Sequence, residues 1–339
     1  MNQETTGKLI LAGDIGATKT SLALYSRDTV LTKPLAQTTV NNATAAGFEE
    51  ILESFLHDHN NRPYTACFGV AGPVSNNRVK MTNLDWILDG PALQKRFAIR
   101  SVTLVNDLVA TAMGAVHLPA DRLRTINAGQ PDPVGTIGVI APGTGLGEAF
   151  LIRHRDSWLP IPSEGGHSSF APTDEQQMRL LRHMTKQHRH VSAEMVCSGR
   201  GLPDLYAFIC AENGSENNLK KHPDPARIII ESALAALDND DQQDNAFMTM
   251  QLFTAILASE AANLALKILA TGGLYIGGGI PPRILPFLHH DRFMNFFAKA
   301  EYREMLGSIP VHIVLEPKTA LIGAAACGLE WSTGSENRA

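Results

Sequence analysis

The sequence predicts an α/β protein built from two domains around a cleft. Strand-like and helix-like stretches alternate along the chain, as they do in α/β folds. Two segments, Leu9 to Tyr25 and Gly138 to Ile152, share one plan: an apolar run, a glycine-rich turn and a second, alternating run. A length of 339 residues favours two domains over one. Together these observations indicate a duplicated architecture with one hairpin in each half.

The elements between and after the two hairpins follow from their patterns. The short apolar runs at Ala66 to Val70 and Val102 to Val105 predict strands, and Ala45 to His57 and Asp107 to Val116 predict helices. A third glycine cluster, LYIGGGI at Leu274 to Ile280, ends another apolar run. We expect the smaller domain to comprise residues 1–108 plus 319–339, and the larger one residues 109–318.

Both glycine-rich turns have the composition of phosphate-binding loops. Glycine lets backbone N–H groups approach a phosphate without a Cβ in the way. In the first turn Asp14 adds a carboxylate able to hold hydrated Mg²⁺, and Thr18 and Lys19 add a hydroxyl and a cation. Either turn alone is equally typical of an ordinary tight hairpin, but the two together with the third cluster favour a nucleotide site. The residues expected to bind the nucleotide are Gly13, Asp14, Gly16, Ala17, Thr18, Lys19, Gly143, Thr144, Gly145, Gly277 and Gly278.

Two better-known nucleotide loops do not fit this chain. A Walker loop requires Gly-Lys-Ser or Gly-Lys-Thr at the start of a helix, and no Gly-Lys here is followed by Ser or Thr. A dinucleotide fingerprint requires GxGxxG between a strand and a helix. The pair Gly145 and Gly147 leads instead into the alternating run AFLI, which predicts a strand.

Composition excludes several classes of partner. The formal net charge of −5 argues against a surface for nucleic acid or another polyanion. The first residues contain no sustained apolar run, and the apolar stretch Leu252 to Ile280 is interrupted by charged and polar residues, so neither a signal peptide nor a membrane span is expected. The four cysteines form no CxxC pair, which is typical of free thiols in a reducing cytoplasm.

The ordered motifs resemble those of the bacterial glucokinases of the hexokinase family, within the sugar kinase/actin/Hsp70 ATPase superfamily. The resemblance runs from Leu11 to about Gly328, through GDIGATKT, AGPVSNNRVKMTNLDW, LVNDLVA, PGTGLGEAF, PSEGGHSSFAP, VSAEMVCSGRGL and IGGGIPPR. It implies an actin-like ATPase (ribonuclease H-like) fold with a central cleft. It also implies a cytoplasmic homodimer that phosphorylates glucose at its 6-hydroxyl with ATP and Mg²⁺.

The resemblance also assigns roles to individual side chains. Asp107, which follows a predicted strand and begins a predicted helix, would take the proton of the sugar hydroxyl; a plain helix cap is the alternative function of such a residue. Hexose hydroxyls require carboxylates, amides and imidazoles in fixed directions. The two glycines of EGGH allow a sharp turn that puts a carboxylate and an imidazole on one ligand. The residues that the resemblance makes sugar-binding are Asn83, Asn106, Asp107, Glu164, His167 and Glu194.

The chain departs from the family pattern at two positions. Ala17 stands where glycine is usual, so its φ must be negative or the turn altered, and Asp85 replaces a proline in the TNLDW loop.

Three alternative functions remain. A kinase for another hexose is the first alternative, because a few hydrogen bonds set specificity. A sugar-sensing regulator is the second, although such proteins usually carry a helix-turn-helix and only eight residues precede Leu9. A chaperone- or actin-like ATPase is the third, against which the Asn106, Asp107 and EGGH set argues.

Overall fold

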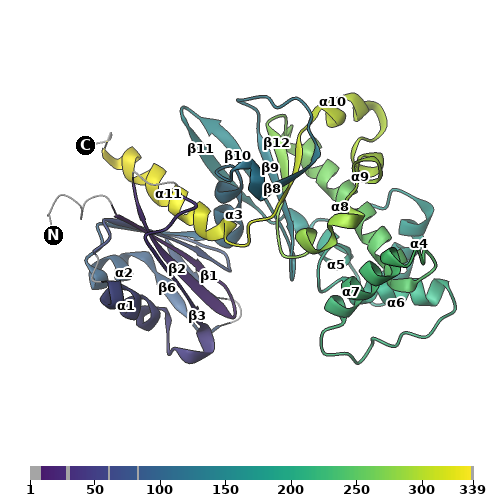
Figure 1. Ribbon diagram of the computed structural model, residues 1–339, viewed down its shortest axis with the longest axis horizontal. Helices are drawn as coiled ribbons and strands as arrows, with labels where there is room; N and C mark the ends of the chain where they lie inside the picture. Colours follow the sequence, from purple (N-terminus) through teal and green to yellow (C-terminus); the bar gives the residue numbers. More distant parts are fainter. Residues whose placement is uncertain (1–8, 28–30, 60–61, 82–83, 337–339) are drawn as a thin grey trace. The chain divides into compact units, whose positions relative to one another are not determined.

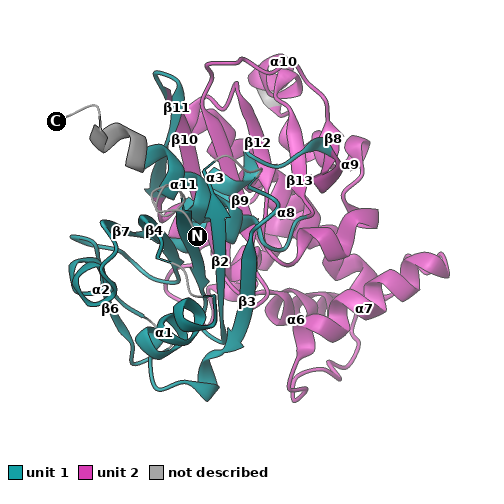
Figure 2. Ribbon diagram, turned by 60° about the vertical axis from the view of Figure 1, so that its left-hand side comes forward, with its two compact units in different colours: residues 1–120, 154–162, 316–339 teal, residues 121–153, 163–315 magenta. Residues whose placement is uncertain are grey.

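The computed structural model describes residues 9–27, 31–59, 62–81 and 84–336. The chain divides into two compact units, and each is described by itself (Figure 2). Unit 1 contains residues 1–120, 154–162 and 316–339, and unit 2 contains residues 121–153 and 163–315. The domain boundaries predicted at residues 108 and 319 stay a prediction; by contacts, the chain leaves unit 1 for the first time after residue 120.

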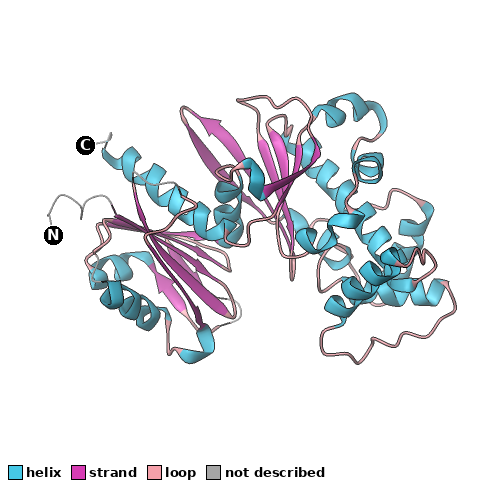
Figure 3. Ribbon diagram, in the orientation of Figure 1, coloured by secondary structure: helices cyan, strands magenta, loops and turns pink. Residues whose placement is uncertain are grey.

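A five-stranded sheet forms the centre of unit 1 (Figure 3). Its strand order is β3-β2-β1-β4-β7. The predicted first hairpin is confirmed, because β1 and β2 pair antiparallel with Ile15 opposite Thr20, whereas β1, β4 and β7 run parallel. The strands are β1 (Leu9–Ile15), β2 (Lys19–Ser26), β3 (Ala36–Asn41), β4 (Thr65–Val70) and β7 (Ser101–Asn106), with a separate pair of β5 (Arg78–Lys80) and β6 (Ile87–Asp89).

Helices cover both faces of this sheet because successive side chains of a strand point to opposite faces. Leu11 of β1 belongs to a buried cluster with Leu52 of α1 and Leu93 of α2, whereas its neighbour Ile10 lies against Gly328 of α11. Both faces are therefore apolar, as the continuous burial of β1 requires. The helices are η2 (Asn42–Thr44), α1 (Phe48–His59), α2 (Gly90–Phe97), α3 (Asp107–Ala115) and α11 (Thr319–Glu336).

Close packing joins α3 to α11 although more than two hundred residues separate them in the chain (Figure 1). A Cβ at Gly323 of α11 would overlap the carbonyl oxygen of Ala110, and one at Gly114 of α3 would overlap that of Thr319. The two glycines let the helix backbones approach each other. This contact fixes the start of α3, where Asp107 lies.

A second sheet forms the centre of unit 2, with the strand order β10-β9-β12-β13-β8 within that unit. The predicted second hairpin is confirmed, because β9 and β10 pair antiparallel from Leu146 opposite Pro142. β12 pairs parallel with both β9 and β13. The strands are β8 (Leu123–Asn127), β9 (Ile137–Pro142), β10 (Leu146–His154), β12 (Gly273–Ile276) and β13 (Val311–Val314); β11 (Ser157–Ser163) follows β10 in the chain.

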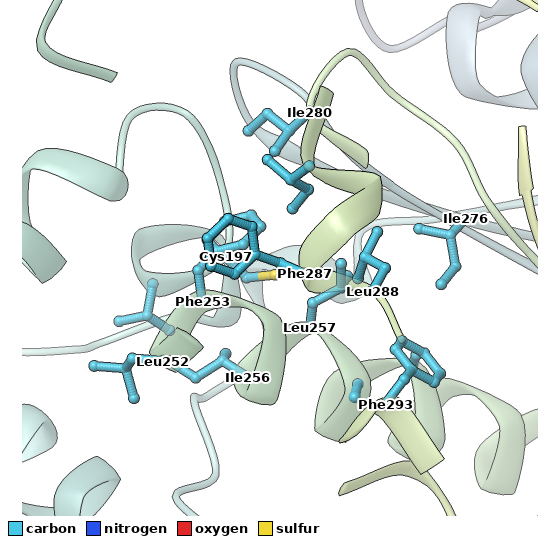
Figure 4. Close-up of a cluster of buried hydrophobic side chains, with 14 of the residues drawn as sticks. Cys197, Leu252, Phe253, Ile256, Leu257, Ile276, Ile280, Phe287, Leu288 and Phe293 are labelled. Carbon is cyan, nitrogen blue, oxygen red and sulfur yellow. The ribbon is translucent and has the colours of Figure 1, made fainter. Parts of the chain in front are cut away.

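The long helix α8 (Asn245–Ile268) is the core of unit 2. Asp244 caps its start, and it ends where Leu269 adopts a left-handed conformation with φ 48°. Its Phe253 and Leu257 pack with Phe287 (Figure 4). The apolar stretch from residue 252 is thus a buried helix followed by a strand, as predicted; no helix in the described part of the chain is long and apolar enough to cross a membrane.

The remaining helices of the described chain are η3 (Ala120–Arg122), η4 (Gly165–His167), α4 (Glu175–Met184), α5 (Ala193–Val196), α6 (Leu202–Glu212), α7 (Pro225–Asp238), η5 (Pro281–Phe287), α9 (His290–Phe297), η6 (Ala300–Tyr302) and α10 (Arg303–Ser308). Six of these shorter helices pack against α8, namely α5, α6, α7, η5, α9 and α10. Alternating strands and helices in both units confirm the predicted α/β class.

Candidate active site

The first hairpin turn in unit 1 is braced by a residue that the sequence did not reveal. Asn42 is 2% exposed, donates from Nδ2 to the carbonyl oxygen of Gly16 (2.9 Å) and accepts from Thr20 Oγ1 (2.8 Å). Its N–H donates to the carbonyl oxygen of Thr18 at 2.8 Å. The turn is therefore held from one side while Ala17 to Lys19 stay exposed. Only the pairing of β2 with β3 brings Asn42 here, so no local signal could have identified it.

The glycines and the alanine of this turn have different tasks. A Cβ at Gly13 would come within 2.6 Å of the Phe68 ring, so this glycine is required by packing against β4. Ala17 does not adopt a positive φ, which meets the condition that its methyl group imposes. The binding of nucleotide phosphates by Gly13 to Lys19 stays a prediction.

Asp14 and Asp107 form an acidic pair in unit 1. Asp14 lies opposite Gly69 of β4, and a Cβ at Gly69 would lie 3.8 Å from the Cα of Asp107. A glycine between the two positions thus leaves room for both carboxylates. Burial, and then the charge of Asp107, raise the pKa of Asp14 to about 6.

Asn106, not Asp107, caps α3. The Oδ1 atom of Asn106 accepts from the N–H groups of Leu108 and Val109 (2.9 and 3.4 Å), and its Nδ2 donates to the carbonyl oxygen of Gly72 (3.3 Å). Asp107 is the first residue of the helix, and its Oδ1 accepts from the N–H of Leu108 at 2.9 Å. The alternative of a capping role for Asp107 is therefore wrong.

The second hairpin turn, in unit 2, is held by Glu194 and by the segment after α5. Glu194 Oε2 accepts from the N–H of Leu146 at 2.9 Å, and a Cβ at Gly145 would overlap this oxygen. The carbonyl oxygen of Gly143 accepts from the N–H of Gly199 at 2.8 Å. The predicted sugar-binding residue Glu194 thus contacts a predicted phosphate loop, although about fifty residues separate them in the chain.

The EGGH segment makes the predicted sharp turn. It forms η4, and Glu164 and His167 lie side by side, with 3.9 Å between Oε2 and Nε2. Both side chains are exposed, by 82% and 62%. A Cβ at Gly166 would overlap the carbonyl oxygen of Leu146, so the turn rests on the start of β10. Structure therefore brings Glu164, His167 and Glu194 together around Leu146.

A cavity of about 610 Å³ opens beside the second hairpin. Gly143 and Thr144 line it, and so do residues that the sequence analysis did not select, namely Gly199, Arg200, Pro203, Pro223, Asp224, Pro225, Ala226, Arg227, Ile230, Gly279, Ile280 and Arg283. Gly278 packs against the backbone at the end of β9: its φ is +84°, and a Cβ at this position would overlap the carbonyl oxygen of Pro142. Gly279 and Ile280 of the third cluster line the cavity, and the roles predicted for Gly277 and Gly278 stay predictions.

Two predictions, the sugar-binding role of Asn83 and the magnesium site, concern features that are not part of the geometry described above. Asn83 lies outside the described residues. Among the described residues, no group of three or more His, Cys, Asp or Glu side chains is arranged to hold a metal ion. A magnesium ion that is bound mainly through water and phosphate needs only one or two protein carboxylates, and the Asp14 and Asp107 pair supplies that number.

Comparisons with known proteins show the family of the chain. The glucokinase family model matches residues 11–330. A glucokinase of Nostoc punctiforme is 38% identical over 340 residues, covering 94% of this chain and 98% of the relative. The crystal structure of a glucokinase from an Antarctic psychrotroph has a TM-score of 0.84 at 33% identity and covers 95% of this chain and 99% of its own.

A more distant structure shows the same fold. The ROK family glucokinase of Streptomyces griseus, solved with glucose and AMPPNP, has a TM-score of 0.64 at 19% identity and covers 95% of this chain and 99% of its own. The fold, with its two glycine-rich hairpins, places the protein among the sugar kinases of the actin-like ATPase fold. The chain belongs to the glucokinase family.

Proposed function

We propose that the protein transfers the γ-phosphoryl group of ATP to the 6-hydroxyl of D-glucose, with Asp107 as the general base. Membership of the glucokinase family supports the proposed reaction. The acidic pair of Asp14 and Asp107 supports the roles that we assign to these two residues. A general base must lie near the attacking oxygen, and the start of α3 presents a carboxylate at the end of a parallel strand, where α/β folds place their ligands.

Asp14 is the proposed holder of Mg²⁺, through water. Its pKa is raised partly by Asp107, so a cation beside the pair would relieve the repulsion between the two carboxylates. When bound, Mg²⁺ neutralises charge that develops on the phosphates during transfer. Asp107 must be ionised to accept the proton of the sugar hydroxyl. Mg²⁺ held beside Asp14 would balance the negative charge of the second carboxylate in the pair.

The backbone of the second hairpin and the cavity beside it form the proposed nucleotide site. No atom lies within 4 Å of a Cβ built at Gly143, so a phosphate can approach its backbone. The lining of the cavity includes Arg200, Arg227 and Arg283, and the apolar residues Ile230 and Ile280. The guanidinium of Arg227 is bound by Asp224 and Glu231, which leaves Arg200 and Arg283 as the proposed phosphate ligands. The size of the cavity is that of sites for small molecules, and such a lining suits a charged, partly aromatic ligand.

Glu164, His167, Glu194 and Asn106 are the proposed sugar ligands. Carboxylate and imidazole atoms 3.9 Å apart can contact neighbouring hydroxyls of one hexose. Glu194 holds the second hairpin through one oxygen, so sugar and phosphate binding are proposed to depend on each other. Asn83 is retained as a weaker sugar ligand, and a cytoplasmic homodimer remains our expectation.

A coupled assay tests the proposal directly. Purified protein is offered glucose, mannose, fructose and N-acetylglucosamine with ATP, and glucose with ADP or polyphosphate; the highest kcat/KM is expected with glucose and ATP. A faster reaction with another hexose would support the first alternative, and no turnover of any sugar would support a sugar-sensing regulator.

The role of Asp107 is tested by Asp107→Ala. Loss of a general base costs about 10²- to 10⁴-fold in kcat, while the affinity for ATP should stay close to that of the wild type. Near-normal turnover of this variant would exclude Asp107 as the base.

A further inference from the structure

Glu148 is a buried carboxyl group directly beneath the EGGH turn. It lies on β10, is 2% exposed, and its Oε1 has no hydrogen-bond partner among the described residues. A Cβ at Gly165 would overlap Oε2 of Glu148. The carboxyl group therefore packs against the backbone of the turn that carries Glu164 and His167.

A second buried carboxylate faces Glu148 from α8. Glu260 is 4% exposed; its Oε2 accepts from Asn263 Nδ2 at 2.9 Å, and its Oε1 lies 3.8 Å from Lys267 Nζ. Lys299 is a second lysine on this side: its Nζ donates to Asn263 Oδ1 at 2.8 Å, and the charge of Glu260 acts on it. The buried thiol of Cys197 faces both carboxyls, and its pKa is raised by burial and by these two glutamates. Both lysines thus compensate the charge of Glu260, whereas Glu148 makes no ion pair among the described residues.

The proton is expected to reside on Glu148. Burial, and then the charge of Glu260, raise the pKa of Glu148 to about 7, while Lys267 opposes the shift. Glu260 has Lys267 at 3.8 Å and a hydrogen bond from Asn263, whereas Oε1 of Glu148 has no partner among the described residues, so Glu148 is the group expected to hold the proton. The assignment of the proton thus follows from the geometry of α8 as well as from the direction of the shift.

We propose that Glu148 is a positioning residue for the sugar-binding turn, which its protonated carboxyl group seats and its ionised form releases. The proposal rests on the proposed roles of Glu164 and His167. Glu148 lies on β10, the charge of Glu260 on α8 acts on it, and its Oε2 lies against Gly165 of η4, a three-residue 3-10 helix whose start has no side-chain cap. When Glu148 ionises beside Glu260, repulsion and hydration displace the carboxylate, and the turn at Gly165 moves with it.

Glucose binding should therefore weaken as pH rises through 7. The test measures the Kd of glucose without nucleotide, by tryptophan fluorescence, and KM and kcat with ATP, between pH 5.5 and 8.5. In the wild type we expect Kd and KM to rise about tenfold across this range, with a smaller change in kcat. Glu148→Gln, which mimics the protonated form, should keep the low Kd at every pH.

Glu260→Gln is the matched variant. Removing this charge lowers the pKa of Glu148, so the midpoint of the transition in Kd should move to lower pH, an effect that a merely structural role of Glu260 would not produce. The inference is overturned if Glu148→Gln has the pH profile of the wild type, or if Glu260→Gln leaves the midpoint unchanged. The second variant keeps the test decisive if the first does not fold.

A readout without sugar separates this inference from the proposed function. Hydrogen exchange of the segment 163–168 should increase through pH 7 beyond the intrinsic rate in the wild type but not in Glu148→Gln. If Glu164→Gln leaves the KM for glucose unchanged, the assignment of Glu164 as a sugar ligand is wrong, independently of the result for Glu148. If hydrogen exchange is the same in the wild type and in Glu148→Gln, the positioning role of Glu148 is wrong, independently of where the sugar binds.

Discussion

Asp14→Asn should make the protein more stable at neutral pH while abolishing its activity. The pKa of Asp14 is raised to about 6 by burial and by Asp107. Ionising this carboxyl group therefore costs more free energy in the folded protein than in the unfolded chain. Asparagine has the same shape without the charge. The proposed catalytic site is thus expected to lower stability, as functional sites commonly do.

The size and the pH window follow from the shift. Below about pH 4 the carboxyl is protonated in both states and has no effect; as pH rises, the unfolded state loses the proton first, and folded stability falls until the pH has passed the folded pKa near 6. A shift of about two units corresponds to about 3 kcal/mol. Asp14 is only partly shielded from solvent, so we expect about 1–3 kcal/mol, or roughly 1–4 °C in Tm.

The assay is urea unfolding of wild type and variant from pH 4.5 to 8, without Mg²⁺ or nucleotide. The difference in free energy of unfolding should be roughly a third of its full value at pH 4.5 and reach that value above about pH 6.5. Asp58→Asn, at a position of α1 that is 64% exposed, is the control and should change little. A variant no more stable than the wild type at pH 8, or a difference independent of pH, would refute the reasoning.

Two further predictions concern glycines. Gly145→Ala places a methyl group against Glu194 Oε2, so the KM values for glucose and ATP should both rise, by about tenfold each; a change in only one would separate the two sites. Gly323→Ala drives a methyl group into the backbone of α3, so unfolding should become easier by about 1–3 kcal/mol or more. Gly307→Ala in α10 is the control: nothing would lie within 4 Å of the added Cβ, so this variant should be neutral or slightly stabilising. Equal changes in Tm for Gly323→Ala and Gly307→Ala would contradict the packing argument.

Local patterns were sufficient for the hairpins and for the start of α3. The turns at Gly13 to Thr20 and Gly143 to Gly147 join strands that pair with their immediate neighbours, so turn chemistry and alternation predict them. The predicted helix at Ala45 to His57 instead begins at Phe48, because η2 occupies residues 42–44 and holds Asn42 under the first turn. Here a tertiary contact prevailed over helical spacing.

The α/β class, the two hairpins and the family can be predicted from the amino-acid sequence, because they depend on contacts between residues close in the chain or on motifs long enough to be recognised. Three features required the folded structure: Asn106 rather than Asp107 caps α3, Arg200 and Arg283 line the cavity, and Glu148 faces Glu260 beneath the EGGH turn. Such pairings bring together residues far apart in the chain, and their energies come from burial and charge that exist only once the chain has folded.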